Sequence, residues 1–235
     1  EDQYFGSIKS RMLNYMNVHL GFSKTSKEVT TDYRYSINEN TLKVLTDRFD
    51  FTEMVIGIRY AYKEKFIKNL RKKISLGTQY PVLKFQYSRG LEGVLDGEFS
   101  YHRYDINIEE SFYTNYWGRT SITLNAGYID SDIPATNLFN GNGSYRVFTI
   151  YASKSFATMR MNEFLSNRYM ALYFVHDFEK LLFKGRWFKP EFAVATNIGF
   201  GQLDDTGSHY GVNFKTMEQG YYESGLLINN LLNVR

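Results

Sequence analysis

The chain has 235 residues, no cysteine and a formal net charge of +3 at pH 7. The lack of cysteine excludes disulfides, cysteine-ligated metal sites and cysteine nucleophiles within it. The one basic cluster, Lys68, Arg71, Lys72 and Lys73, is not accompanied by any nucleic-acid-binding motif, so we expect no nucleic-acid partner. No apolar run approaches the roughly eighteen residues of a membrane-spanning helix.

Alternation of apolar and polar residues predicts about nine strands, in chain order. The first two are expected to form a hairpin, Met12–Phe22 with Val29–Ile37, turning at Lys24 to Lys27 and followed by a less regular connection at Asn38 to Asp50. A helix over 11–22 is the alternative, but it would place more polar residues on its buried face. The other strands are expected at 54–62, 82–87, 104–112, 122–128, 170–178, 192–200 and 222–228.

The stretch from Tyr104 to Phe112 shows two faces of opposite character. Its even positions are apolar except for Glu110, and its odd positions are Asp105, Asn107, Glu109 and Ser111. Because strand side chains alternate between faces, one face is apolar and the other strongly polar. Strands near ten residues cross a bilayer at a tilt, whereas strands of soluble sandwiches usually have about five or six residues. The pattern predicts an all-β, antiparallel transmembrane β-barrel with lipid outside and water inside.

Composition agrees with this interpretation. The chain has 20 Tyr and 19 Phe, and Tyr suits a bilayer interface because its ring is apolar and its hydroxyl is wet. The mean hydropathy of −0.41 is uninformative, because a barrel needs only every second residue apolar. We expect residues 1–235 to be a fragment of a larger barrel, since about nine strands is an odd number and bacterial single-chain barrels usually have an even one.

The alternation assigns side chains to the two sides of the barrel wall. The residues expected to face lipid are Ile56, Ile58, Ile106, Ile108, Leu124, Phe174 and Val194. The residues expected to face the lumen are Arg59, Asp105, Asn107, Asn125 and Asn197.

One long segment, Asp132 to Asn167, breaks the alternation. It has too many large apolar groups for disorder, so it should fold into the barrel or over its mouth. Met159 to Leu165 could form a short helical turn. The candidate site residues of this lumen loop are Gly141, Gly143, Tyr145 and Arg146. Tyr145 and Arg146 are expected near its deepest point, with Arg146 paired to an inward carboxylate such as Asp105 or Glu109.

No constellation in the sequence indicates catalysis, a metal or a cofactor. The four histidines form no close ligand pair, and Gly141-x-Gly143 lacks the third glycine of a nucleotide-binding turn. Ser208 and His209 lie near Asp204 and Asp205 as a hydrolase triad would on paper, but no G-x-S-x-G surrounds them. We therefore predict that the chain is not an enzyme and that it uses no cofactor.

An ordered series of short motifs resembles a known family. The series runs through Tyr80-Pro81-Val82-Leu83, Tyr87-Ser88-Arg89-Gly90, Gly97 to Arg103, Gly118 to Gly127, Ile133-Pro134, Asn140 to Tyr145 and Asn162 to Tyr169. It is similar to the DUF5686 family of Bacteroidota outer-membrane proteins, over roughly residues 50–232. The resemblance implies an outer-membrane barrel, usually preceded by a carboxypeptidase-regulatory-like domain. Residues 1–235 would then be the C-terminal part of a larger barrel of roughly sixteen strands.

The layout that this resemblance implies is also similar to the Omp85 superfamily, in which a long loop before the last few strands folds into the lumen. By that analogy 132–167 is the lumen loop. The Omp85 loop normally carries an Arg-Gly-aromatic tip, whereas this chain has only Tyr145-Arg146-Val147.

The first functional hypothesis is an integral protein of the bacterial outer membrane with an Omp85-like role in envelope biogenesis or transport. Its partners would be the lipid bilayer and other outer-membrane or periplasmic proteins. The alternative is a structural or accessory barrel of a larger outer-membrane complex, without transport of its own. A barrel-embedded hydrolase is a third class, for which no motif argues.

Overall fold

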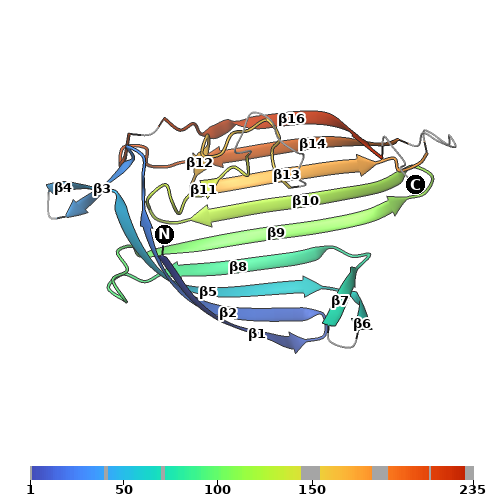
Figure 1. The fold of residues 1–235 in the computed structure, drawn as a ribbon, viewed down its shortest axis with the longest axis horizontal. Helices are drawn as coiled ribbons and strands as arrows, with labels where there is room; N and C mark the ends of the chain where they lie inside the picture. The colour runs from blue at the N-terminus through green and yellow to red at the C-terminus, as the bar shows by residue number, and fades with distance from the viewer. Residues whose placement is uncertain are drawn as a thin grey trace.

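The computed structural model describes residues 2–39, 42–69, 72–143, 154–181, 190–211 and 213–230. All regular elements in these ranges are β-strands, and nine of them form one antiparallel sheet in the order β1-β2-β5-β8-β9-β10-β13-β14-β16 (Figure 1). Their bounds are β1 Asp2–Leu13, β2 Met16–Glu28, β5 Arg48–Ala61, β8 Val82–Gly90, β9 Tyr101–Thr114, β10 Gly118–Ile129, β13 Arg168–Asp177, β14 Glu191–Gln202 and β16 Met217–Asn229. The predicted all-β, antiparallel class is confirmed. In the same ranges there is no helix with the length and hydropathy to cross a membrane.

Short strands in the connections form three small sheets. One has the order β15-β3-β4, from β3 (Arg34–Glu39), β4 (Leu42–Thr46) and β15 (His209–Tyr210). The second pairs β11 (Phe139–Asn140) with β12 (Leu165–Ser166), and the third is the hairpin of β6 (Lys65–Asn69) and β7 (Lys72–Gly77). Lys68, Lys72 and Lys73 of the basic cluster fall on this last hairpin.

The predicted N-terminal hairpin is wrong. β1 pairs with β2 across a turn at Asn14 and Tyr15, where Tyr15 has a φ of 69°. Lys24 and Lys27, which were expected to form the turn, lie inside β2. The side chain of each binds a residue of another segment. Lys24 binds the Asp96 carboxylate at 2.6 Å, and Lys27 donates to the Thr136 carbonyl at 3.0 Å.

The expected second strand, Val29–Ile37, also requires correction. Residues 29–33 lie outside every strand, and β3 leaves the main sheet to pair with β4 and β15. The connection expected to be irregular, Asn38 to Asp50, instead includes β4 and the beginning of β5. The competing helix is absent, since Met16 to Phe22 pairs with β1 on one side and β5 on the other. The count of nine strands therefore agrees, but β1 takes the place that Val29–Ile37 was given.

The alternation assigned the two faces of the sheet correctly. Ile108 stands opposite Leu124, and their polar neighbours Asn107 and Asn125 stand opposite each other on the other face. The described parts of the segment 132–167 pack against the polar face, which we call the inner face, and the apolar side is the outer face.

The inner face is covered at one end by a hydrophobic cluster. We call this end, where β5 begins and β10 finishes, the cap end, and the opposite end, with the turns after Leu13 and Thr114, the turn end. The cluster joins sheet residues to the small sheet β15-β3-β4 and to 133–139; it comprises Tyr33, Tyr35, Phe49, Phe51, Phe99, Tyr101, Ile129, Ile133, Leu138, Phe139, Leu165 and Leu203. A second buried cluster lies over β13, β14 and β16; it comprises Phe156, Met159, Phe164, Ala171, Tyr173 and Met217. On β2, β5, β8, β9 and β10 the inner face towards the turn end is polar.

Candidate functional site

The polar part of the inner face is organised in rows that cross neighbouring strands. Strand register places Asn17, Arg59, Lys84, Asn107 and Asn125 directly opposite one another on β2, β5, β8, β9 and β10. The adjacent row towards the cap end carries His19, Gln86 and Asp105. Inward residues of antiparallel neighbours come within contact distance of each other. The sheet therefore collects cations and amides from five strands on one surface.

Ion pairs fix most of the cations on this surface. Arg59 donates to both carboxylate oxygens of Glu64, at 2.8 and 2.7 Å. Glu109 accepts from Lys84 at 2.6 Å and from Lys154 at 2.8 Å. Lys154 belongs to the segment 132–167, so this carboxylate joins the segment to the sheet. Glu109 was expected to receive Arg146; that residue and Tyr145 lie outside the described residues.

Asn137 is the main attachment point for the first half of the segment. Its amide nitrogen donates to the Tyr101 hydroxyl at 2.9 Å, and its side-chain oxygen accepts from the Lys27 ammonium at 2.7 Å. Its carbonyl accepts from Arg103 at 3.1 Å. Tyr101, which is buried, donates in turn to Glu53. Three strands of the sheet therefore hold one asparagine.

Rings of the segment lie on glycines of the sheet. A Cβ at Gly127 would collide with the Phe139 ring, and a Cβ at Gly199 would lie 2.8 Å from Cζ of Phe156. Phe139 also stacks on Tyr169, with ring centroids 6.1 Å apart. The absence of a side chain at these inward positions is what lets the segment approach the sheet so closely.

The second half of the segment is held by Glu223 on β16. The carboxylate accepts from the backbone N–H of Ala157 at 2.9 Å and of Thr158 at 3.0 Å, and from the Thr158 hydroxyl at 2.7 Å. It also accepts from the Asn197 amide at 2.6 Å. Charge-assisted bonds of this kind are stronger than neutral ones. The segment is thus tied both to the middle of the sheet and to its last strand.

The predicted site residues that the structure describes lie inside this segment. The space where Gly141 would carry a Cβ is taken by the Met159 sulfur, 2.5 Å away, and at Gly143 by the Arg160 carbonyl oxygen at 2.7 Å. Both glycines therefore pack against residues 159–160 of the same segment. The helical turn expected at Met159 to Leu165 is instead a bend, with Asn162 at a φ of 58° and a backbone bond from Glu163 to the Arg160 carbonyl.

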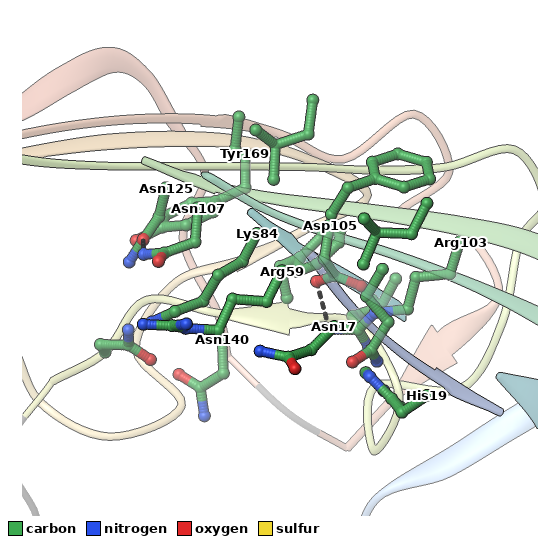
Figure 2. Close-up of a pocket in the computed structure, with 18 of the residues that line it drawn as sticks. Asn17, His19, Arg59, Lys84, Arg103, Asp105, Asn107, Asn125, Asn140 and Tyr169 are labelled. Atoms are coloured by element: carbon green, nitrogen blue, oxygen red, sulfur yellow. Dashed lines mark hydrogen bonds and ion pairs between the residues drawn. The ribbon is translucent and has the colours of Figure 1, made fainter. Parts of the chain in front are cut away.

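A cavity of about 620 Å³ lies on the inner face beside the segment (Figure 2). Its polar lining is Lys9, Asn17, His19, Arg59, Lys84, Gln86, Arg103, Asp105, Asn107, Asn125, Asn140, Asn142 and Tyr169. Leu138 and Phe139 of the segment contribute apolar surface. A second cavity of about 390 Å³ shares Lys9, Asn17 and Arg59 with it and extends to Arg11 and Glu64.

The residues that resemble a hydrolase triad make other contacts. The Ser208 hydroxyl donates to Asp205 at 2.6 Å, whereas His209 Nδ1 shares a 2.9 Å hydrogen bond with the Tyr33 hydroxyl. His209 is stacked in the aromatic cap between Tyr33, Tyr35 and Phe214. Across the described ranges, no three acidic or histidine side chains are grouped as a metal site would require.

Sequence reasoning missed Asn137, Lys154 and Glu223, which carry most of the attachment. Asn137 and Lys154 lie in a stretch without periodicity, and nothing in the sequence identifies their partners. A signal was available for Glu223, because it is the one charged residue on a side of β16 whose other members are Tyr221, Gly225, Leu227 and Asn229.

Comparisons with known proteins give a family and remote structural likenesses. Residues 9–210 match the family described as "Family of unknown function (DUF5686) C-terminal domain". No curated protein matches the chain. Among solved structures, OccK11 (OpdR) of Pseudomonas aeruginosa is similar at 13% identity and a TM-score of 0.31, over 98% of this chain and 66% of that one. The chain therefore spans just under two thirds of the length of that protein.

Proposed function

Because the chain belongs to the DUF5686 family, matching its C-terminal domain, we propose that the nine-stranded sheet is part of the wall of an integral outer-membrane β-barrel. Its outer face contacts lipid, and its inner face lines a hydrated lumen that the segment 132–167 partly fills. The first part of the proposal is that the sheet lies in the outer membrane. The second part is that the protein acts in envelope transport or biogenesis.

The outer face carries the first part of the proposal. Large apolar side chains stand exposed along it on all nine strands; they include Ile8, Leu20, Phe22, Met54, Ile58, Leu83, Phe85, Ile106, Phe112, Met170, Val194, Phe200, Leu226 and Ile228. Soluble monomers rarely expose contiguous apolar patches larger than a few hundred Å². A surface of this extent needs an apolar covering, and lipid provides one along the full length of the strands.

Aromatic residues mark both ends of this apolar band. Towards the cap end, Tyr87, Tyr104 and Tyr128 form a row on adjacent strands, with ring centroids 5.3 and 6.3 Å apart. Towards the turn end stand Tyr60, Tyr62, Tyr80 and Phe112. From Tyr104 to Phe112 the strand rises roughly 26 Å, comparable to the ~25 Å band between the aromatic girdles of outer-membrane barrels.

A second sheet packed on the outer face is the competing cover. In such a sandwich the polar inner face would be the solvent-exposed one, yet here Leu138, Phe139 and Phe156 of the segment 132–167 bury part of it. Here β2, β5, β9 and β16 have 13 or 14 residues, and apolar side chains follow one another on one side of the strand, as at Met54, Ile56, Ile58 and Tyr60 of β5. That length suits a bilayer crossing better than a sandwich strand.

The test places one charge at the same depth on either face. In the full-length protein expressed in its own outer membrane, Ile108→Arg puts a cation at the middle of the apolar band and should cost about 2–4 kcal/mol of membrane-folded stability. Asn107→Arg, one residue away on the inner face, is the matched control and should fold. Membrane fractionation and heat-dependent gel mobility report folding. If both variants fold equally well, the outer face does not contact lipid.

The position of the segment 132–167 supports the second part of the proposal, a role in transport or biogenesis. It enters between β10 and β13, three strands before the end of the sheet, as an Omp85-like lumen loop would, and is held by hydrogen bonds and ion pairs that can be broken. A transport or biogenesis barrel should leak when these bonds are removed. Glu223→Gln should therefore raise uptake of bulky hydrophilic antibiotics without lowering the amount of protein in the membrane. Unchanged uptake with a released segment would favour the accessory-barrel alternative.

A further inference from the structure

We propose that the cavity on the inner face binds a polyhydroxylated anion, meaning a sugar that carries a carboxylate or a phosphate. This inference rests on the proposed function, because it takes the inner face to be a hydrated lumen. It adds the chemical class of the solute, which the fold alone does not give.

The first observation is an excess of positive charge. The two adjoining cavities are lined by five cations, Lys9, Arg11, Arg59, Lys84 and Arg103, and by two carboxylates, Glu64 and Asp105. Arg59 is paired with Glu64, and Arg103 with Asp105 at 3.0 Å. Within the described part of the chain, Lys9 has no ion pair, and Lys84 shares Glu109 with Lys154. A wet surface lined mainly by one sign of charge concentrates ligands of the opposite sign.

The second observation is the number of amides among these cations. Asn17, Gln86, Asn107, Asn125 and Asn140 all line the larger cavity (Figure 2). The Asn107 amide nitrogen donates to Asn125 at 2.6 Å, but its own oxygen is buried and accepts no hydrogen bond from the described residues. A primary amide both donates and accepts, which matches a hydroxyl group. The free Asn107 oxygen is an acceptor for such a hydroxyl.

Size and closure agree with a small solute. A volume of about 620 Å³ lies within the roughly 300–1,000 Å³ typical of small-molecule sites. Leu138 and Phe139 close the cavity on the side of the cap. Cations alone would suit a simple anion. Cations interleaved with amides suit an anion that also carries several hydroxyls.

The experiment measures binding to the purified full-length protein in detergent by titration calorimetry. The probes are trigalacturonate, glucose phosphate and, as the neutral comparison, maltotriose. We expect at least one of the anionic sugars to bind and maltotriose to bind much more weakly. The dissociation constant for the anion should rise with salt, because exposed charges are screened. Whether carboxylate or phosphate binds more tightly identifies the source of the anion.

Substitutions then locate the binding. Lys9→Gln and Lys84→Gln should each weaken binding about tenfold, the worth of one hydrogen bond to a charged group. Lys9→Arg should retain it. Arg89→Gln, an outward position on the same strand as Lys84, is the matched control and should change nothing.

The inference is overturned if maltotriose binds as tightly as the anions, or if neither lysine variant differs from the unaltered protein. Absence of all binding would overturn it as well. If this happens while the protein still fractionates with the outer membrane, only the ligand class is wrong. Failure of membrane integration would count against the proposed function instead.

Discussion

Removing the Asn137 side chain should release the first half of the segment 132–167 from the sheet. Asn137→Ala deletes the neutral hydrogen bond to Tyr101 and the charge-assisted one from Lys27. A neutral bond contributes about 1 kcal/mol and a bond to a charged group about 1.5–3 kcal/mol. The attachment should therefore weaken by roughly 2–4 kcal/mol, which raises the detached population roughly 30- to 700-fold.

Thiol labelling measures this directly, because the 235 residues contain no cysteine. Ala135→Cys places a small thiol two residues from Asn137, where Ala135 packs against the cap cluster. Its labelling rate by a bulky maleimide in the full-length protein should rise by about the same factor when Asn137→Ala is added. Asn140→Ala is the matched control, because the Asn140 side chain bonds to Asn162 of the same segment and not to the sheet. Equal labelling rates in the Ala135→Cys protein and in its two double variants would refute the role of Asn137 as the main attachment point of the segment.

Two further changes test the packing and the cap. Gly127→Val should lower the free energy of unfolding by about 1–3 kcal/mol, because its side chain would displace the Phe139 ring, whereas Gly225→Val, with open space around its Cβ, should be tolerated in the same denaturant titration. Burial lowers the pKa of His209, with Asp205 acting in the opposite direction. The neutral imidazole is therefore the folded form, so stability is unaffected above the unfolded pKa of about 6.5 and is lost as the pH falls below it. Hydrogen-exchange protection of β3 should decline between about pH 7 and pH 5. The variant His209→Phe should remove that decline. If the decline persists in the variant, another titrating group causes it.

Alternation predicted the middle of the sheet because each strand there has one apolar and one polar side. Asp105, Asn107 and Arg59 could be assigned to the inner face from the sequence, since a one-residue slip in register would move every apolar group to the wet side. The same logic failed in the N-terminal third. Lys24 and Lys27 looked like a turn, but each is satisfied by a residue more than seventy positions away. Such partners are set by tertiary structure and leave no local signal.

The segment 132–167 shows the other limit of sequence reasoning. Its apolar content indicated burial, and its described parts are packed on the inner face. Of the two carboxylates expected to pair with Arg146, Asp105 is bound by Arg103 and Glu109 by Lys84 and Lys154, while Arg146 lies outside the described residues. A lumen carboxylate attracts whichever cation the chain brings near, so its presence predicts that a pair forms but not with which residue. The role of the inward glycines could not be predicted either, because the aromatic ring that packs on each glycine comes from another segment of the chain.

The cap cluster has a consequence for the order of assembly. Its members come from positions between Tyr33 and Leu203, with Phe214 packed against them, so the cluster can form only when nearly the whole chain is in place. Closing loops of this length has an entropic cost before any contact compensates it. We therefore expect the main sheet to form first. Aromatic packing at its cap end is then a late event, which a chain that stops before Leu203 could not complete.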